Sequence, residues 1–183
     1  MGQPKMLLPW RETTVLGQVV ETFSRVGISD ILVITGGDRD LVEKEVSRLV
    51  EGFPIRAVFN PSFEQGGMMS SIQAGLTASP PECKAMLIGL GDQPQVEEKT
   101  LKDILADYAK SAAKIIVPSY KYRRGHPVLV DITHRPELLN LDPHLSLRDF
   151  LNAHQKEINY IDADASVLQD LDTPQDYQRY QRI

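Results

Sequence analysis

The chain has 183 residues, of which 42% are hydrophobic and 25% are charged, a composition that predicts one globular domain spanning residues 1–183. Its net charge of −5 argues against nucleic acid or an anionic membrane surface as a partner. The apolar runs are strand-sized, no secretory leader is expected, and the single cysteine, Cys83, excludes an intrachain disulfide. We therefore expect a cytoplasmic protein that does not enter the membrane.

Helices and strands are predicted to alternate along the chain. Thr14 is expected to cap a first helix that stops at Gly27, Ser146 to start a late helix, and Pro174 to occupy the first position of the last one. The other helices are expected after Asp38, from about Met69 to Leu76, and around 101–108; the strands are expected at 31–34, 56–60, 85–90, 114–117, 127–132 and 158–161. Such alternation is typical of a doubly wound α/β sheet.

The most informative stretch is the apolar run Ala85 to Leu90, which ends in Gly91-Asp92-Gln93-Pro94. A short apolar run closed by glycine and proline predicts a strand buried on both faces of a parallel sheet. Ligands of such sheets bind beyond the carboxyl ends of the strands, where Asp92 would lie. A carboxylate there could hold Mg²⁺ against substrate phosphates. The alternative is that Asp92 only caps a helix beginning near Val96.

Short motifs extend along nearly the whole chain. They are Met1-Gly-Gln-Pro-Lys5, Asn60 to Phe63, Gly66-Gly-Met-Met-Ser-Ser71 with Gly75-Leu76, Gly91-Asp-Gln-Pro94, Gly125-His-Pro-Val128 and Asp170-Leu-Asp-Thr-Pro-Gln-Asp-Tyr177. In this order they resemble the molybdenum cofactor nucleotidyltransferase family. The last two motifs resemble its cytidylyltransferase branch more than its guanylyltransferase branch.

The resemblance implies a Rossmann-like, three-layer α/β/α nucleotidyltransferase fold, mostly parallel, with one late antiparallel strand. It also implies Mg²⁺-dependent transfer of CMP from CTP to the phosphate of molybdopterin carrying molybdenum, with release of pyrophosphate. A molybdenum hydroxylase would be a further partner. Two alternatives remain open: a nucleotidyltransferase for another phosphorylated acceptor such as a sugar phosphate, and a non-catalytic accessory protein that binds the cofactor.

The sequence departs from the family pattern at its beginning. It starts inside the opening signature, so the family's first strand, glycine-rich loop and arginine do not precede Met1-Gly-Gln-Pro-Lys5. We expect a misassigned or truncated start; the alternative is a naturally shortened and inactive relative. Without that strand, a strand in the middle of the sheet should have unpaired backbone groups and exposed apolar surface.

The resemblance assigns catalytic roles to Lys5 and Asp92 and a metal site to Asp92 and Asp172. Lys5 would neutralise the donor phosphates, or it is a solvated side chain near the terminus. Asp170 is the rival of Asp172, and both could instead cap the helix at Pro174. The basic stretch from Lys121 to Arg124 could receive an anion, although a solvated hairpin turn is the safer interpretation.

Nucleotide or substrate contacts are predicted for a second group of residues. Glycines allow close backbone approach, and serines at a helix start favour phosphate or base contacts, although ordinary capping would also explain them. A histidine held between glycine and proline could donate a hydrogen bond to an acceptor phosphate or to the pterin, or it could be structural. The group comprises Asn60, Gly66, Gly67, Ser70, Ser71, Gln93, Pro94 and His126. The other histidines, His134, His144 and His154, show no metal-ligand spacing and are given no role.

Overall fold

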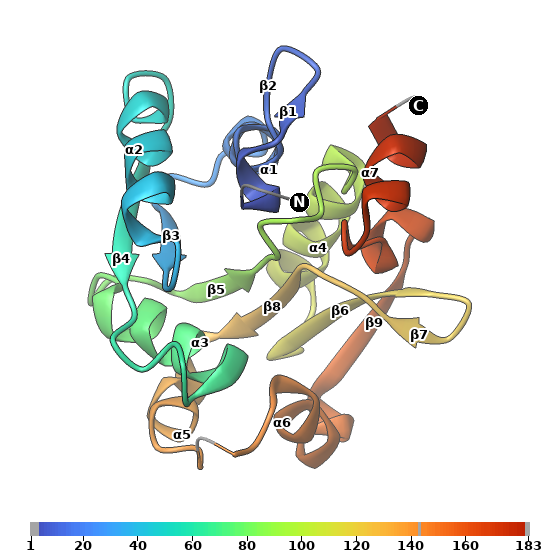
Figure 1. The fold of residues 1–183 in the computed structure, drawn as a ribbon. Helices are drawn as coiled ribbons and strands as arrows, with labels where there is room; N and C mark the ends of the chain where they lie inside the picture. Colours follow the sequence, from blue (N-terminus) through green and yellow to red (C-terminus); the bar gives the residue numbers. More distant parts are fainter. Residues whose placement is uncertain (1–3, 143, 182–183) are drawn as a thin grey trace.

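The computed structural model describes residues 4–142 and 144–181, so Met1, Gly2 and Gln3 of the opening motif lie outside the described residues. The helices are α1 (Val15–Arg25), α2 (Arg39–Leu49), α3 (Gly67–Ala78), α4 (Glu98–Lys110), α5 (Arg135–Leu139), α6 (Leu147–Ala153) and α7 (Pro174–Gln181). The strands are β1 (Pro9–Trp10), β2 (Thr13–Thr14), β3 (Ile31–Thr35), β4 (Ile55–Phe59), β5 (Ala85–Ile88), β6 (Ile115–Tyr120), β7 (Arg123–Arg124), β8 (Val128–Asp131) and β9 (Ile158–Asp162). Figure 1 shows their arrangement.

The predicted helix starts at Thr14, Ser146 and Pro174 are confirmed. Thr14 Oγ1 accepts a hydrogen bond from the backbone N–H of Gly17 at 3.0 Å. Ser146 forms a capping box with Asp149, which satisfies two backbone N–H groups that the helix itself leaves free. Pro174 is the first residue of α7, where its missing N–H costs no helical hydrogen bond. Local sequence chemistry therefore sets these boundaries.

The larger sheet contains the predicted late antiparallel strand. β8 lies between β5 and β6 and runs antiparallel to both, while β9 pairs in parallel with the other edge of β6. The short β7 folds back on β6 through a turn in which Lys121 and Tyr122 have positive φ angles, so the basic stretch is a hairpin turn. The strand order explains how β5 and β6 share a direction although they are not neighbours.

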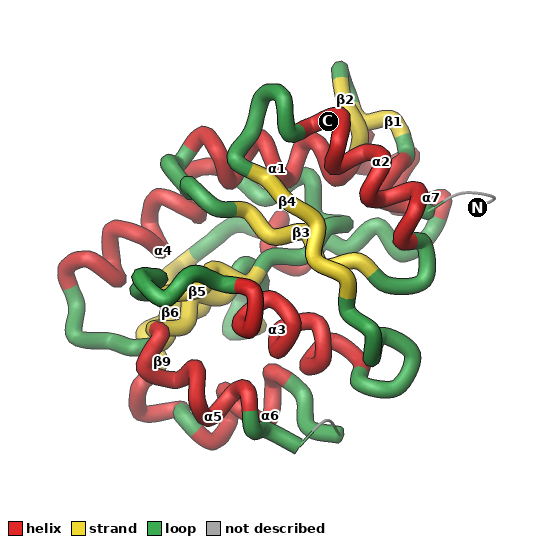
Figure 2. Tube along the Cα trace, turned by 90° about the vertical axis from the view of Figure 1, so that its left-hand side faces the viewer, coloured by secondary structure: helices red, strands yellow, loops and turns green. Residues whose placement is uncertain are grey.

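Side chains alternate between two helical layers along these strands. Ile115 and Val117 of β6 pack in the cluster formed by α3, α5 and α6, which includes Phe150. Ile116 between them packs on the opposite face against Ile104 of α4. Figure 2 shows α4 on one side of β5 and β6, with α3, α5 and α6 on the other. Because successive side chains of a strand point to opposite faces of the sheet, helices pack on both faces. The result is the three-layer arrangement that the sequence predicted.

The expectation that the strand at residues 85–90 is buried on both faces is wrong. All four residues of β5 are only partly buried, whereas all four of its neighbour β8 are buried. The reason is pairing: β8 has a strand on each side, but among the described residues β5 pairs with β8 alone. The parallel pair β3–β4 forms a separate sheet, and no ladder joins it to β5 within the described residues.

No helix within the described ranges is both long enough and apolar enough to cross a bilayer.

A buried carboxylate at the end of β8 provides a test of the sheet's electrostatics. Asp131 accepts hydrogen bonds from the Thr133 backbone N–H at 2.9 Å and from the Tyr108 hydroxyl at 2.6 Å. Burial raises the pKa of Asp131, but hydrogen bonds from Thr133, Tyr108 and Lys114 outweigh burial and hold the pKa well below its ordinary value. The ionised carboxylate therefore stabilises the fold above the unfolded-state pKa of about 3.9, and this contribution is lost as the pH falls further.

We expect Asp131→Asn to lower the free energy of unfolding by about 1–3 kcal/mol at pH 7, because donors are left without a charged acceptor. Urea unfolding at pH 7 and at pH 3 would measure the effect, which should shrink at the lower pH. Asp103→Asn, at an exposed carboxylate paired with Lys99, is the matched control and should change little. An equal cost at both pH values would contradict the account.

Candidate active site

Lys5 lies between two carboxylates from distant parts of the chain. Its Nζ is 2.5 Å from Asp92 Oδ2 and 3.0 Å from Asp172 Oδ1. The lysine begins a 3₁₀ helix, Lys5–Leu7, whose Met6 packs among the buried side chains of α1 and α2. A Cβ on Gly91 would lie 3.2 Å from Met6 Sδ, which places this helix directly against the loop that carries Asp92. Packing of Met6 thus brings Lys5 to Asp92.

The loop after β5 is joined to the segment before α7 by three hydrogen bonds. The Gln93 side-chain amide donates to Asp170 Oδ1 at 2.7 Å, and the Gln95 amide donates to the carbonyl of Gln169 at 3.1 Å. The backbone N–H of Leu171 donates to the carbonyl of Asp92 at 3.2 Å. These contacts bring the loop of Asp92 and the segment of Asp172 together beside Lys5.

Helix capping does not explain either carboxylate. The N-cap residue of α4 is Glu97, and no side-chain cap is formed there. At α7, the Thr173 hydroxyl accepts from the Asp176 N–H, and the Asp176 carboxylate accepts from the Thr173 N–H. The capping interpretations of Asp92 and of the Asp170/Asp172 pair are therefore wrong.

The two carboxylates favour the charged form of Lys5. Partial burial lowers the pKa of Lys5, but hydrogen bonds and charge attraction from Asp92 and Asp172 raise it more, so the pKa lies above the ordinary value. The ammonium is thus firmly protonated at neutral pH. Its position marks a point at which two anionic oxygens converge on one cation.

His126 lies close to the same acidic loops. Its backbone N–H donates to the carbonyl of Val167 at 3.0 Å. Burial lowers the pKa of His126, and this effect exceeds the opposing attraction of Asp170 and Asp92. The neutral imidazole keeps its Nε2 buried without a hydrogen-bond partner among the described residues.

Other buried polar atoms in these loops are also unpaired within the described part of the chain. They are Gln93 Oε1, Gln95 Oε1 and Ser166 Oγ. Buried polar groups normally find a protein or water partner, so unpaired ones are consistent with a place for a polar ligand or ordered water. Gln95 and Ser166 were not among the predicted residues. No local pattern marks them, because the contact between Gln95 and Gln169 joins residues 74 positions apart.

The predicted group around the start of α3 forms its own internal network. Asn60 is 2% exposed, and its amide donates to the hydroxyls of Ser70 at 2.8 Å and Ser71 at 3.2 Å. Its Oδ1 accepts from the backbone N–H of Ser62 at 2.9 Å. These contacts fix the loop between β4 and α3. No hydrogen bond within the described residues connects them to Lys5, Asp92 or Asp172.

The two glycines of this loop have different structural requirements. A Cβ on Gly66 would lie 2.3 Å from Ser70 Cβ, so a larger residue would displace the helix start. Gly67 has φ +52° and open space around it, so its backbone conformation is what favours glycine. Pro94, in the other loop, is buried. Contacts of these residues with a nucleotide stay a prediction.

Taken together, these features define an α/β protein with converging carboxylates and a lysine beyond the carboxyl end of β5. The chain belongs to the family of MobA-like NTP transferase domains, whose model matches residues 1–158. It is therefore an enzyme of the nucleotidyltransferase class, and its fold is the nucleotidyltransferase fold of its structural neighbours.

Three similar proteins are informative. Nicotine blue oxidoreductase of Paenarthrobacter nicotinovorans is 30% identical over 177 residues, covering 93% of this chain and 84% of the relative. Molybdenum cofactor cytidylyltransferase of Escherichia coli is 27% identical, covering 100% of this chain and 92% of the relative. The crystal structure of Rv0371C from Mycobacterium tuberculosis, a complex with manganese, is 28% identical, with a TM-score of 0.80 over 100% of this chain and 94% of that one.

Proposed function

We propose that this enzyme transfers CMP from CTP to the terminal phosphate of molybdopterin carrying molybdenum, and releases pyrophosphate. The observation that carries the proposal is the placement of Lys5 Nζ between the carboxylates of Asp92 and Asp172. The 27% identical cytidylyltransferase, which aligns along all of this chain, supports the choice of donor and acceptor. The proposal places the reaction in the cytoplasm, with a molybdenum hydroxylase as the user of the product.

The residues present fit a hard divalent cation. Asp92 Oδ2 and Asp172 Oδ1 already approach one cationic nitrogen, and carboxylate oxygens are the protein ligands that Mg²⁺ prefers. Asp170 fits less well, because its Oδ1 accepts from Gln93. We propose that Asp92 and Asp172 hold Mg²⁺. When bound, the ion would neutralise charge on the triphosphate oxygens.

The reaction requires positioning more than proton transfer. An oxygen of the acceptor phosphate, already ionised at neutral pH, attacks the α-phosphorus of CTP. A new P–O bond forms, the bond from the α-phosphorus to the bridging oxygen breaks, and pyrophosphate leaves with the electron pair. Lys5 would turn from the carboxylates to the donor phosphates and stabilise the charge that develops there.

The remaining residues would orient the substrates. His126 presents an unpaired Nε2, which could donate a hydrogen bond to the acceptor phosphate or the pterin if that nitrogen carries the proton. The loop of Asn60, Gly66 and Gly67 and the start of α3, with Ser70 and Ser71, would receive the nucleoside. Helix N-termini favour anions and hydrogen-bond acceptors, because their first N–H groups have no helical partner.

A nucleotide panel tests the proposal. We expect CTP with Mg²⁺ to raise the melting temperature more than GTP, UTP, ATP or NADH, each measured with and without Mg²⁺. Ligand at a hundred times its Kd stabilises the folded state by about 2.7 kcal/mol, or roughly 5–10 °C for a chain of this size. NADH is included because one relative is named an oxidoreductase.

Any other outcome would contradict part of the proposal. Selective stabilisation by another triphosphate would contradict the CTP assignment. Selective stabilisation by NADH would favour redox chemistry on this fold. Binding of molybdopterin without stabilisation by any triphosphate would favour the accessory protein, and turnover of CTP with a sugar phosphate alone would replace the acceptor.

A further inference from the structure

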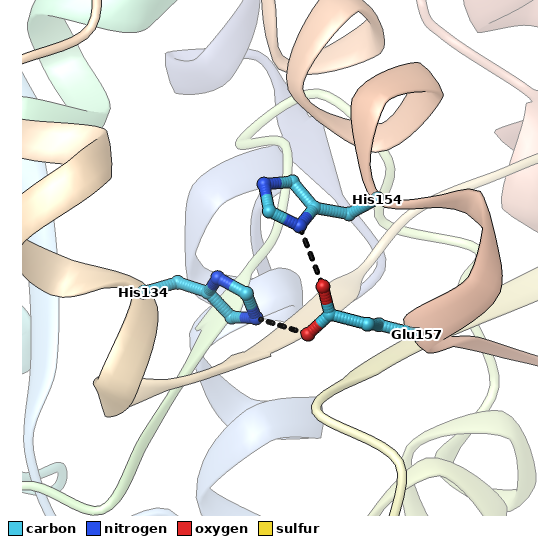
Figure 3. A group of neighbouring side chains, drawn as sticks. All are labelled: His134, His154 and Glu157. Carbon is cyan, nitrogen blue, oxygen red and sulfur yellow. Dashed lines mark hydrogen bonds and ion pairs between the residues drawn. The ribbon is translucent and has the colours of Figure 1, made fainter.

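A second cluster of metal-binding side chains lies outside the proposed active site. Its members are His134, His154 and Glu157, whose ligand atoms all lie within 4.8 Å of one another (Figure 3). Glu157 Oε1 is 2.8 Å from His154 Nδ1, and Glu157 Oε2 is 3.3 Å from His134 Nε2. The sequence did not reveal this cluster, because the two histidines are 20 residues apart and come from different elements.

Packing fixes both imidazole rings. His134 is 8% exposed and its ring meets the edge of Phe150, a core residue, at a centroid distance of 5.4 Å. The rings of His134 and His154 lie 4.8 Å apart. His134 Nε2 is buried and lies 3.3 Å from Glu157 Oε2, but it makes no well-aligned hydrogen bond among the described residues. A buried nitrogen whose carboxylate neighbour is not aligned for a hydrogen bond can accept a further ligand.

A second glutamate contacts the nitrogens that face away from Glu157. Glu137 Oε1 is 2.8 Å from His154 Nε2, and Glu137 Oε2 is 3.7 Å from His134 Nδ1. Metal-binding histidines commonly donate their second ring N–H to a carboxylate, which fixes the tautomer and the ring orientation. Glu137 is placed to do this for His154 and, after a small shift, for His134.

We propose that His134 Nε2, His154 Nδ1 and one Glu157 oxygen bind a zinc-type transition-metal ion, with Glu137 orienting the imidazoles. Two nitrogens and a carboxylate are a common zinc ligand set, whereas Mg²⁺ prefers oxygen ligands. Bonds of about 2.1 Å in a tetrahedral site separate neighbouring ligand atoms by roughly 3.4 Å. The two nitrogens contact different oxygens of Glu157, at 2.8 and 3.3 Å, and the ligand atoms all lie within 4.8 Å of one another, so small side-chain movements would bring three of them to this spacing.

This site lies at the opposite end of the sheet from Asp92. His134 follows β8, whose last residue, Asp131, pairs with Ala85 at the beginning of β5, whereas Asp92 follows the end of β5. Glu157 immediately precedes β9. In Figure 1, α5 and α6 accordingly lie far from the N-terminal segment and α7. A bound ion would join α5, α6 and the start of β9, and so would stabilise the fold without taking part in the transfer.

Titration of the chelator-treated full chain with Co²⁺ tests the proposal. We expect one equivalent to bind with the intense visible absorption of tetrahedral Co²⁺, and Zn²⁺ to displace it and raise the melting temperature. Glu157→Gln and His154→Ala should each abolish the absorption. His144→Ala, at an exposed histidine outside the cluster, should retain it.

One further variant separates this site from the active site. The double variant Asp92→Asn/Asp172→Asn should keep the Co²⁺ absorption, and its loss there would assign the ion to the other site. Absorption that survives His154→Ala, or its absence from folded wild-type protein, would overturn the proposal. Circular dichroism of each metal-free variant shows whether it is folded, and Glu157→Gln, at an exposed position, provides the test if His154→Ala does not fold.

Discussion

Asp92→Asn is expected to lower the rate of Mg²⁺-dependent CMP transfer at least about a hundredfold, the scale of losing one group that stabilises transition-state charge. The asparagine keeps the size of the side chain and removes the charge that faces Lys5 Nζ at 2.5 Å. Since the carbonyl of Asp92 accepts from Leu171 through the backbone, that link between the two loops should persist. Steady-state kinetics with varied Mg²⁺ would measure the loss, together with a higher Mg²⁺ requirement.

The matched control is Asp103→Asn, which also removes one carboxylate paired with a lysine, but on the exposed face of α4. It should leave turnover and Mg²⁺ dependence unchanged. If Asp92→Asn retained normal Mg²⁺-dependent turnover, the assignment of Asp92 as a metal ligand would be wrong. A folded Asp92→Asn variant that binds CTP but does not turn it over would support the assignment.

Lys5→Met is expected to have two opposite effects. Methionine has similar length and no charge, so kcat/KM for CTP should fall about ten- to a hundredfold as the donor phosphates lose a cationic partner. In the absence of nucleotide, however, Mn²⁺ should bind more tightly. The ammonium that lies 2.5 Å from Asp92 and 3.0 Å from Asp172 would no longer compete for their oxygens.

Electron paramagnetic resonance of Mn²⁺ and CTP kinetics, measured on the same preparations, would follow both effects. Lys99→Met is the control, because Lys99 pairs with Asp103 on the surface of α4. Weaker Mn²⁺ binding in Lys5→Met would mean that the ammonium supports the ion instead of occupying its place. An unchanged kcat/KM in Lys5→Met would mean that Lys5 is a solvated side chain without a catalytic role, the alternative that the sequence left open.

Local chemistry made much of the fold predictable. The caps at Thr14 and Ser146 and the proline at the start of α7 are decided within a few residues, so the sequence places them well. The position of Asp92 was also predictable, because a strand end followed by glycine and proline sets where the side chain lies. Its convergence with Asp172 came from the family resemblance, since 80 residues separate the two.

The sequence did not predict the partial exposure of β5 or the cluster of His134, His154 and Glu157, and both have a different physical origin. Whether β5 is buried depends on which strands pair with it, and this is a property of the sheet that no window of the sequence contains. The contacts of His134 with His154 and Glu157 arise near the start of β6, which lies between the end of β8 and the beginning of β9. Spacing rules find metal ligands on one helix or hairpin, so they missed a cluster that only tertiary packing assembles.

CMP transfer itself can be followed by incubating the full chain with Mg²⁺, CTP labelled at its α-phosphate, and molybdopterin carrying molybdenum. We expect label to enter a pterin–cytosine dinucleotide in amounts equal to the pyrophosphate released, and Asp92→Asn to abolish both. Folded wild-type protein that binds CTP with Mg²⁺ but releases no pyrophosphate, with either this acceptor or a sugar phosphate, would contradict the proposed transfer.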